Sequence, residues 1–237
     1  MAADEIDYVI EGDFSPMLSI TLDPGEAVQA EAGSMVMMQP DIGMSTEMPG
    51  GFFGSILRKV SGETFFMTFF TNTGRERRTV CFASPMPGQI RALDLAAEGG
   101  AFFCQRRAYL ASAKGIGITI ALTRRLTSGL FGGEGLILQK LEGDGWAFLA
   151  AGGTLVERGL AAGERISVST GHLVGFSATC DYEISFQRGI RNVLFGGEGL
   201  FVTHVTGPGR VIVQTQPIAD LALALHALVP PEKRRDE

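Results

Sequence analysis

The stretch "GLFGGEGLILQKLEGDG" at residues 129–145 returns with few changes as "VLFGGEGLFVTHVTGPG" at residues 193–209. The two FGGEG motifs begin at Phe131 and Phe195, which sets their spacing along the chain at 195 − 131 = 64. In both copies an apolar run follows the motif, and a glycine turn closes the stretch. Self-similarity at a fixed spacing is the signature of a repeat architecture. The pair therefore predicts that the chain is built from repeated units.

A weaker third copy of the motif precedes these two. In "SGETFFMTFF" at 61–70, Gly62-Glu63 aligns with Gly133-Glu134, and the spacing is 133 − 62 = 71. Aromatic residues follow it, and the copy ends at Gly74. The chain is therefore expected to contain three units, of which the first has the most altered motif.

A second short element also occurs three times. "EAGSMV" at 31–36, "RRAYLA" at 106–111 and "STGHLV" at 169–174 align at spacings of 106 − 31 = 75 and 169 − 106 = 63. A Gly-Glu pair stands upstream of the first and third copies, but the middle copy shows only Pro87-Gly88, further away. Two elements in the same order, three times, support three units, with the middle one altered at this turn.

The segments between the glycine turns have the patterns of strands. "RISVST" at 165–170 alternates with a period of two, and "LILQKL" and "LFVTHV" are short apolar runs between turns. In "PIADLALALHALVP" at 217–230, apolar residues instead recur with the period of a helix, and prolines mark its start and end. We expect the apolar face of this helix to cover the last sheet.

The sequence thus predicts an all-β fold: three repeats of short antiparallel strands, with one C-terminal helix. The expected ranges are 1–74, 75–145 and 146–216 for the three β repeats, 217–229 for the helix and 230–237 for a flexible tail, all within one compact unit.

Composition narrows the class of protein. Charged residues are only 19% of the chain and apolar residues 45%, which indicates extra buried surface such as a subunit interface. The net charge of −6 disfavours nucleic-acid binding. Cys81, Cys104 and Cys180 are odd in number and widely spaced, which predicts buried free thiols rather than disulfides or a zinc site. An acidic N-terminus and the lack of a long uncharged apolar run lead us to expect a cytoplasmic protein.

The FGGEG motif superficially resembles a phosphate-binding loop. It lacks the Lys-Ser/Thr of a P-loop and the spacing of a dinucleotide fingerprint, and a strand rather than a helix follows it. We interpret it as a tight turn whose glycines allow positive φ and close chain approach. Its glutamates either pair across repeats or bond turn amides; a metal site would need converging partners that the sequence does not show. The turn motif comprises Gly62, Glu63, Gly132, Gly133, Glu134, Gly135, Gly196, Gly197, Glu198 and Gly199.

No catalytic, cofactor-binding or metal-binding residue is predicted. His172, His204 and His226 lack metal-ligand spacing, and the sequence has no GxSxG or HExxH motif. His172 aligns with Ser34 and Tyr109, so its position accepts different chemistry. We expect no enzyme, with a triad assembled from distant residues as the alternative.

Two apolar stretches could form surfaces. Met35 and Met37 alternate as on one strand face, which favours core packing over a soft-metal site. "MPGGFFGSILRKV" at 48–60 sets Phe52 and Phe53 beside Arg58-Lys59. This stretch is either another repeat element or an aromatic loop that contacts a partner or a membrane surface.

Four stretches together carry a family resemblance: "GGFFGSILRKVSGETFFMTFFTNTG", "GLFGGEGLILQKLEGDG", "STGHLVGF" and "NVLFGGEGLFVTHVTGPGRVIVQT". They resemble the altered-inheritance-of-mitochondria protein 24 family, from about Val9 to Leu228. The resemblance implies three repeats like the tryptophan RNA-binding attenuation protein, a fold related to double-stranded β-helices, and a ring-like homo-oligomer, a trimer. The mitochondrial relatives are linked to inner-membrane organisation, but this chain shows no targeting segment. The family offers no established catalytic residues.

The expected function is a non-enzymatic oligomeric scaffold or interaction module without a cofactor, with an unknown protein partner contacted near Phe52 and Phe53. A small-molecule-binding ring protein is the alternative. An RNA-binding ring is less favoured because of the charge of −6.

Overall fold

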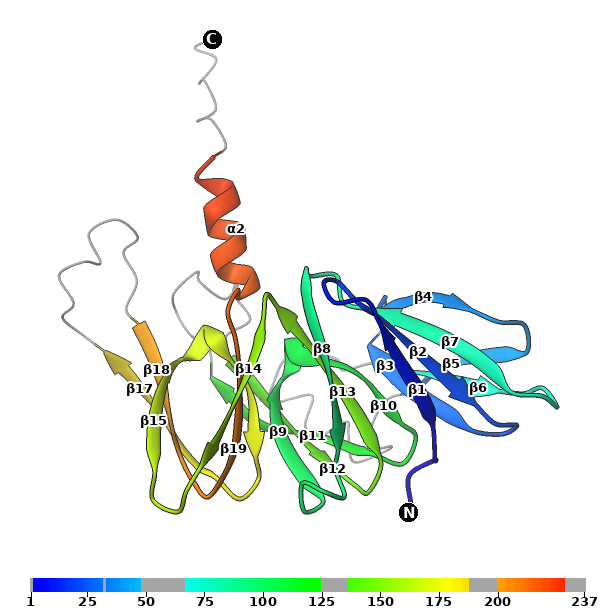
Figure 1. The fold of residues 1–237 in the computed structure, drawn as a ribbon, viewed down its shortest axis with the longest axis horizontal. Helices are drawn as coiled ribbons and strands as arrows, with labels where there is room; N and C mark the ends of the chain where they lie inside the picture. The colour runs from blue at the N-terminus through cyan, green and yellow to red at the C-terminus, as the bar shows by residue number, and fades with distance from the viewer. Residues whose placement is uncertain (1, 32, 48–66, 125–135, 188–199, 229–237) are drawn as a thin grey trace, which may run out of the picture.

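The computed structural model describes residues 2–31, 33–47, 67–124, 136–187 and 200–228. Its described elements are nineteen β-strands, two 3-10 turns and the helix α2 (Figure 1). Every strand pair in the four sheets is antiparallel. The predicted all-β fold with a C-terminal helix is confirmed.

The strand orders of the sheets are as follows. Sheet 1 runs β1 (Asp7–Glu11), β2 (Met17–Leu22), β7 (Arg78–Ala83), β4 (Met35–Met38). Sheet 2 runs β5 (Ile42–Glu47), β6 (Met67–Asn72), β3 (Ala27–Glu31), β10 (Tyr109–Ala113), β13 (Trp146–Gly152), β8 (Gly88–Asp94). Sheet 3 runs β11 (Gly117–Arg124), β12 (Leu136–Glu142), β9 (Ala101–Gln105), β16 (Leu173–Ser177), β19 (Gly209–Gln214), β14 (Leu155–Leu160). Sheet 4 runs β15 (Arg165–Ser169), β18 (Leu200–Thr206), β17 (Asp181–Gln187).

These orders repeat with a period of six strands. Adding six to each label of sheet 2 gives sheet 3, and the same step relates β2-β7-β4 to β8-β13-β10. We call β2–β7, β8–β13 and β14–β19 units 1, 2 and 3. Each six-stranded sheet is shared by two units, which join through the pair β3–β10 or the pair β9–β16. The period places β7 and β13 in the units before them, whereas the expected ranges 75–145 and 146–216 begin with these strands.

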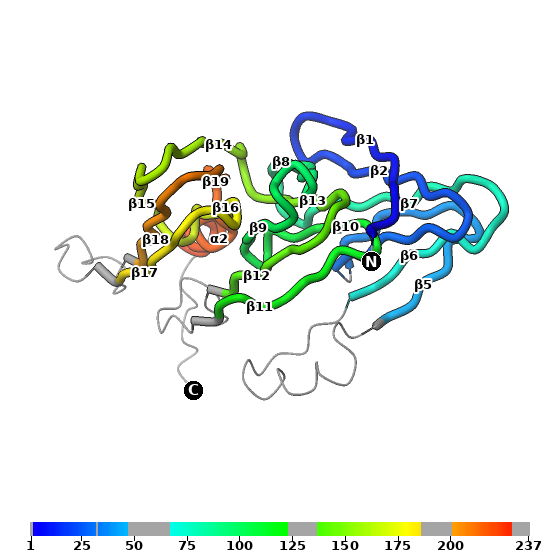
Figure 2. The backbone as a smooth tube through the Cα atoms, turned by 90° about the horizontal axis from the view of Figure 1, so that it is seen from below, coloured from blue at the N-terminus to red at the C-terminus, as the bar shows by residue number. Residues whose placement is uncertain are grey.

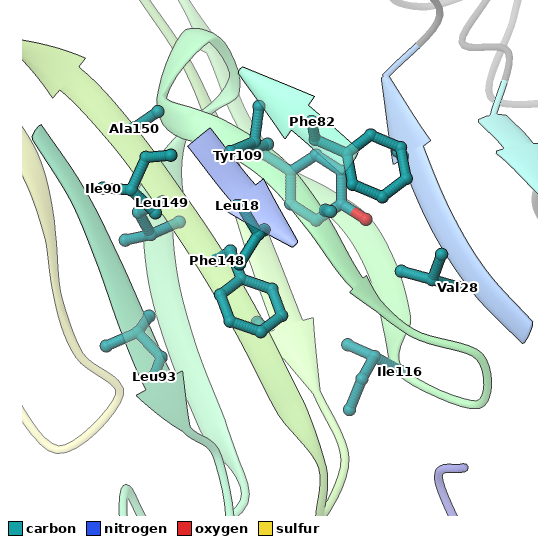
Figure 3. Packing of buried hydrophobic residues seen from close by; sticks show 14 of the residues in the cluster. Leu18, Val28, Phe82, Ile90, Leu93, Tyr109, Ile116, Phe148, Leu149 and Ala150 are labelled. Atoms are coloured by element: carbon teal, nitrogen blue, oxygen red, sulfur yellow. The ribbon is translucent and has the colours of Figure 1, made fainter. Parts of the chain in front are cut away.

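Alternating strands bury one row of side chains between facing sheets. In β2 the even positions Leu18, Ile20 and Leu22 are fully buried, and the residues between them are half-buried. Together with Phe82 and Phe148 they belong to a core cluster that runs through units 1 and 2 (Figure 3). A smaller cluster, with Phe176 and Val205, fills unit 3. The shared sheets thus connect the units into one body.

A β-bulge recurs at the start of one strand in each unit. The register shifts between Met35 and Met37, between Tyr109 and Ala111, and between Leu173 and Gly175. Strand pairing therefore sets the offsets at 109 − 35 = 74 and 173 − 109 = 64, not the predicted 75 and 63. The predicted alternation of Met35 and Met37 is wrong because the bulge interrupts it. Met35 packs against the core, while Met37 is 54% exposed.

The middle unit keeps the turn that the sequence pattern assigned to Pro87-Gly88. By the same offsets, Gly99 stands where Gly25 and Gly163 stand, and all three have φ between 77° and 90°. A left-handed turn before the strand explains glycine at each position. Pro87-Gly88 is therefore not the counterpart of the Gly-Glu pairs in the outer units. The middle unit has the same turn at Gly99, and Gly100 takes the place of the glutamate.

In the outer units this turn is closed by a glutamate. Glu26 Oε2 accepts a hydrogen bond from the Asp23 N–H at 2.7 Å, and Glu164 Oε2 accepts one from the Ala161 N–H at 2.8 Å. Gly100 occupies this position in unit 2, where Asp94 Oδ1 accepts from the Ala96 N–H instead. The Gly-Glu pairs thus have a structural role in the loop.

The helix α2 (Ile218–His226) is confirmed, but its apolar face does not cover a sheet. None of its residues is buried, and Leu223 and Leu225 are more than half exposed. Figure 1 shows α2 projecting away from the strands. Helical periodicity predicts amphipathicity, but not whether the preceding chain directs the apolar face toward the body. The predicted tail at 230–237 lies outside the described residues.

The core cluster gives a direct test of packing. Phe148→Ala is expected to lower the free energy of unfolding by about 3–5 kcal/mol, because it removes a buried ring and leaves a cavity beside Tyr8. The ring centroids of Tyr8 and Phe148 are 4.9 Å apart. Urea unfolding followed by circular dichroism measures the change. Val9→Ala, at a side chain that is 59% exposed, should stay within about 0.5 kcal/mol of the parent; equal losses in both variants would contradict the assignment of Phe148 to the core.

Candidate functional site

Two described strands have free edges that their counterparts do not have. β10 and β16 each lie between two partners, whereas among the described strands β4, at the matching position in unit 1, pairs only with β7. Likewise β3 and β9 have two partners, whereas β15, their counterpart in unit 3, has β18 as its only partner within the described residues. The outermost strands of sheets 2 and 3 differ from these, because they are edge strands in two consecutive units: β5 and β11, and β8 and β14. β4 and β15 therefore carry the two halves of a junction that this chain forms twice internally.

The side chains of β4 are exposed where those of its counterparts are buried. Every residue of β10 and of β16 is buried, but in β4 only Met35 is half-buried. Val36, Met37 and Met38 are 54%, 54% and 41% exposed. An edge strand with a run of exposed apolar residues is a template for pairing with another chain.

The free edges lie at opposite ends of the molecule. Figure 1 places β4 and β7 at one end and β15, β17 and β18 at the other, with units arranged side by side between them. Seen at right angles in Figure 2, the two ends again lie far apart. β4 therefore has no access to β15 of the same chain in this arrangement.

Each internal junction is completed by side chains that match across it. At the first, Gln29 lies opposite Ser112, and its Nε2 donates to Ser112 Oγ at 3.0 Å. The Tyr109 hydroxyl joins this buried group through the Gln29 carbonyl, also at 3.0 Å, and burial raises the pKa of Tyr109. At the second, Phe103 lies opposite Phe176, and the rings stack with centroids 5.3 Å apart. The backbone plan is shared, while the side-chain pairs differ.

Charged residues reinforce the second junction. Arg210 on β19 bonds Glu157 on β14 at 2.9 Å and also bonds Glu98. Arg91 on β8 approaches the other oxygen of Glu157 at 2.6 Å. Ser177 Oγ donates to Glu98 at 2.9 Å. Since β8 belongs to unit 2 and the other two strands to unit 3, the network fixes these units relative to each other.

A cavity of about 410 Å³ opens where all three units meet at the base of α2. Its lining includes the 3-10 turn η2 (Arg106–Ala108), the end of β13 and residues at the start of α2. Both acidic and basic side chains reach it, from Glu31, Arg106 and Arg107. This is the size of cavity that binds small molecules in proteins.

The histidines with described contacts hold structure together. His204 bonds Ser167 Oγ at 2.8 Å through Nδ1 and Ser185 Oγ at 2.9 Å through Nε2. His172 bonds the Gln214 carbonyl at 2.9 Å and lies 3.5 Å from Asp220 of α2. In the part of the chain that the structure describes, no three His, Cys, Asp or Glu residues gather as metal ligands would.

The residues predicted from sequence to form turns and contacts lie outside the described residues. This applies to Phe52 and Phe53 and to the whole turn motif: Gly62, Glu63, Gly132, Gly133, Glu134, Gly135, Gly196, Gly197, Glu198 and Gly199. The strands that follow the motif do keep its spacing. The equivalent positions Thr71, Glu142 and Thr206 give offsets of 142 − 71 = 71 and 206 − 142 = 64. These are the spacings of the motif copies themselves.

The free edges and the cavity are features that sequence reasoning missed. One signal for the edge was present: in the apolar run Val36, Met37 and Met38, the large Met37 stands where the other copies have the small residues Ala111 and Gly175. A run of apolar residues does not show by itself whether its partner belongs to the same chain. The cavity has no local signal because residues from three units line it.

Comparison with known protein families identifies the family of this chain. A family model described as Mitochondrial biogenesis AIM24 matches residues 8–216. The chain belongs to the AIM24 family. The family expected from the sequence is thereby confirmed.

Two streptococcal proteins are similar to this AIM24-family chain. An uncharacterised protein of Streptococcus pyogenes serotype M6 is 28% identical over 230 residues, which cover 91% of this chain and 87% of that protein. The crystal structure of another Streptococcus pyogenes protein matches with a TM-score of 0.75 and 24% identity, covering 95% of this chain and 100% of that one. The second likeness shows that the two chains share a fold. Neither name states an activity.

Membrane crossing by a helix finds no support in the described part of the AIM24-family chain, where no helix combines the length and the apolar character that a bilayer requires.

The three cysteines are free and buried, as the sequence predicted. Burial raises the pKa of the Cys104 thiol to about 12, and burial followed by the charge of Asp181 raises the pKa of Cys180. A thiol with a raised pKa holds little thiolate at neutral pH and is a poor nucleophile. These two residues therefore contribute no reactive thiol to a catalytic site.

Thiol labelling tests this conclusion. In the native protein at pH 8, Cys104 and Cys180 are expected to stay unmodified by a disulfide reagent such as Ellman's for hours, since the reaction requires exposed thiolate. In guanidinium chloride all the cysteines should react within minutes. Mass spectrometry of the peptides identifies the sites. Arg158→Cys, on the exposed part of β14, is the positive control; rapid native labelling of Cys104 would contradict its burial.

Proposed function

We propose that this AIM24-family chain is a non-enzymatic protein that assembles into a closed homo-oligomeric ring and acts there as a scaffold or interaction module. The observation that carries the proposal is the pair of free edges β4 and β15. Each repeats a strand that is paired on both sides elsewhere in the chain. Pairing β4 of one copy with β15 of the next repeats the internal junction, and a head-to-tail contact of this kind closes a ring when the rotation permits.

The internal junctions fix the register of this contact. At the first junction Ala111 lies opposite Ala30, and at the second Gly175 lies opposite Cys104. Carrying the same positions to the free edges sets Met37 opposite Val168, Met38 opposite Ser167 and Gln39 opposite Ile166. The contact would bury the exposed Val36, Met37 and Met38, and the low charge fraction of the chain agrees with such burial.

A trimer of nine units is the ring that we propose. The separation of β4 and β15 at opposite ends of the chain supports closure between copies rather than within one copy (Figure 1). We do not propose RNA binding, because the net charge of −6 disfavours a continuous basic belt.

The register gives a sharp test of the ring. Met38→Asp with Ser167→Asp places like charges opposite each other and is expected to convert the oligomer to monomers at micromolar concentration. Met38→Asp with Ser167→Lys places opposite charges there and should keep the assembly. Both positions are at least partly exposed in the single chain, so the fold should survive. Light scattering after gel filtration measures the mass.

Two outcomes would contradict the proposal. A parent protein that is a stable monomer at micromolar concentration rules out the ring. Equal behaviour of the two double variants rules out this register, whatever the oligomer. Arg158→Asp on β14, an outer edge strand whose counterpart β8 is also an edge, is the matched control and should leave the mass unchanged.

The scaffold also needs a surface for its partner, and we propose Phe52 and Phe53, which lie outside the described residues. Phe52→Ser with Phe53→Ser is expected to leave the mass of the oligomer unchanged and to abolish binding to liposomes or recovery of partners, because aromatic side chains supply most contact energy at such surfaces. Liposome flotation and affinity capture measure this. Unchanged binding in both assays would remove these residues as the contact surface.

A further inference from the structure

The cavity at the base of α2 lies within one chain, and each unit contributes to its wall. Unit 1 supplies Glu31, Ser34 and Ser84–Met86, unit 2 supplies η2 and the end of β13, and unit 3 supplies Gln214, followed by Ile218 of α2. We propose that this cavity binds a small organic anion with an apolar body. The proposal goes beyond the ring, since the site is complete in a single copy.

The cavity exists because side chains that fill the second junction are missing from the first. At the second junction Gln105 Nε2 donates to the Thr170 carbonyl, and Gln214 Nε2 donates to the Gly171 carbonyl, at 2.7 and 2.9 Å. His172 then bonds the Gln214 carbonyl at 2.9 Å. Hydrogen-bonded side chains thus occupy the space between the 3-10 turn η4 (Thr170–His172) and the neighbouring strands.

The offsets of 74 and 64 identify the residues in the same places at the first junction. Ala108, rather than the Tyr109 of the sequence alignment, stands for His172. Ala150 stands for Gln214, and Glu31 stands for Gln105. Both alanines are buried in the cavity wall. Two large polar side chains are therefore replaced by methyl groups, while the backbone around them is kept. The cavity that these alanines line measures about 410 Å³.

The charges of the wall favour an anion. Among the described lining residues, the charged ones are Arg106, Arg107 and Glu31, which sum to +1 in a chain of net charge −6. At the second junction the residues equivalent to the two arginines are Thr170 and Gly171, which are uncharged. Of the two described 3-10 turns, the one at the cavity therefore carries arginines and its counterpart η4 carries none. Guanidinium groups form strong charge-assisted bonds to carboxylates and phosphates.

Hydroxyl groups and apolar side chains complete the site. Ser84 Oγ accepts a hydrogen bond from the Met86 N–H at 3.1 Å, so its own hydrogen can point to a ligand oxygen. Pro85, Met86 and Ile218 add apolar wall. A cavity of this size with an apolar wall and a few polar groups fits a molecule of one or two rings that carries one acidic group.

Fluorescence of 8-anilinonaphthalene-1-sulfonate, an apolar aromatic anion, reports on the site. We expect saturable binding by the parent protein. Ala108→His with Ala150→Gln copies the residues of the second junction into the cavity and should abolish this binding. Arg107→Ala should weaken it about fivefold or more, and Glu31→Gln, which copies Gln105, should strengthen it. Arg158→Ala removes an exposed arginine outside the cavity and should change nothing.

Displacement of the dye identifies the acidic group. 1-Naphthoate and 1-naphthyl phosphate compete as the carboxylate and phosphate arms, and neutral 1-naphthamide is the control. Displacement by either anion at concentrations tenfold below the amide supports the proposal, and the stronger one names the class. Equal displacement by the amide overturns the preference for an anion.

Two results overturn the site itself: undiminished dye binding by the filled variant, or equal losses in Arg107→Ala and Arg158→Ala. If the filled variant does not fold, as judged by circular dichroism, the Arg107 and Glu31 variants decide. Gel filtration of every variant reports the oligomer separately, so failure of this site and failure of the ring are distinguishable.

Discussion

The structure depends on antiparallel pairing between strands of neighbouring units. One unit has two small half-sheets, and a strand at the inner edge of each half-sheet leaves backbone N–H and C=O groups without partners. The pairs β3–β10 and β9–β16 satisfy these groups and turn four half-sheets into two sheets of six strands. The core then continues across the junction, because each shared sheet supplies buried side chains to both units. Among the described strands, β4 and β15 lack the second partner that their counterparts have, and the proposed ring would supply it.

One backbone plan carries a different set of side chains at each junction. The first uses a buried polar group around Gln29 and Ser112, and the second uses the stacked rings of Phe103 and Phe176. At the free edges the corresponding residues are Met38 and Ser167. Strand pairing tolerates such variation because its hydrogen bonds come from the backbone. Side chains can therefore fill the space at one junction and leave a cavity at another, where the alanines beside η2 line it.

Membership of the AIM24 family and the likeness to a streptococcal crystal structure establish the fold, and a fold does not fix an activity. Functional questions therefore move to particular surfaces: the edges of β4 and β15, the exposed apolar residues of α2 and the cavity beneath it. His172 and His204 make structural hydrogen bonds, and the three cysteines are buried.

Some features could be predicted from sequence because they depend on local order along the chain. The motif spacings of 71 and 64 equal the offsets between equivalent strands, and the period of two and the helical period correctly located strands and α2. Predictions failed where a single inserted residue changed the strand register, or where the equivalent residue stood at another position in the chain. The bulge after Met35 exposed Met37, and Gly99 kept a turn that residue types alone had assigned to Pro87-Gly88.

The sequence by itself determined the repeated units, their strands and the family, because turn glycines and apolar periods act within a few residues of each other. Only the tertiary structure decided which edges are paired and which are free, which way α2 projects and where the cavity lies. These properties depend on contacts between residues far apart in the chain, such as Ala111 with Ala30 and Gly175 with Cys104. No local pattern encodes the partner of an edge, because the backbone groups that pair there are the same in every residue except proline.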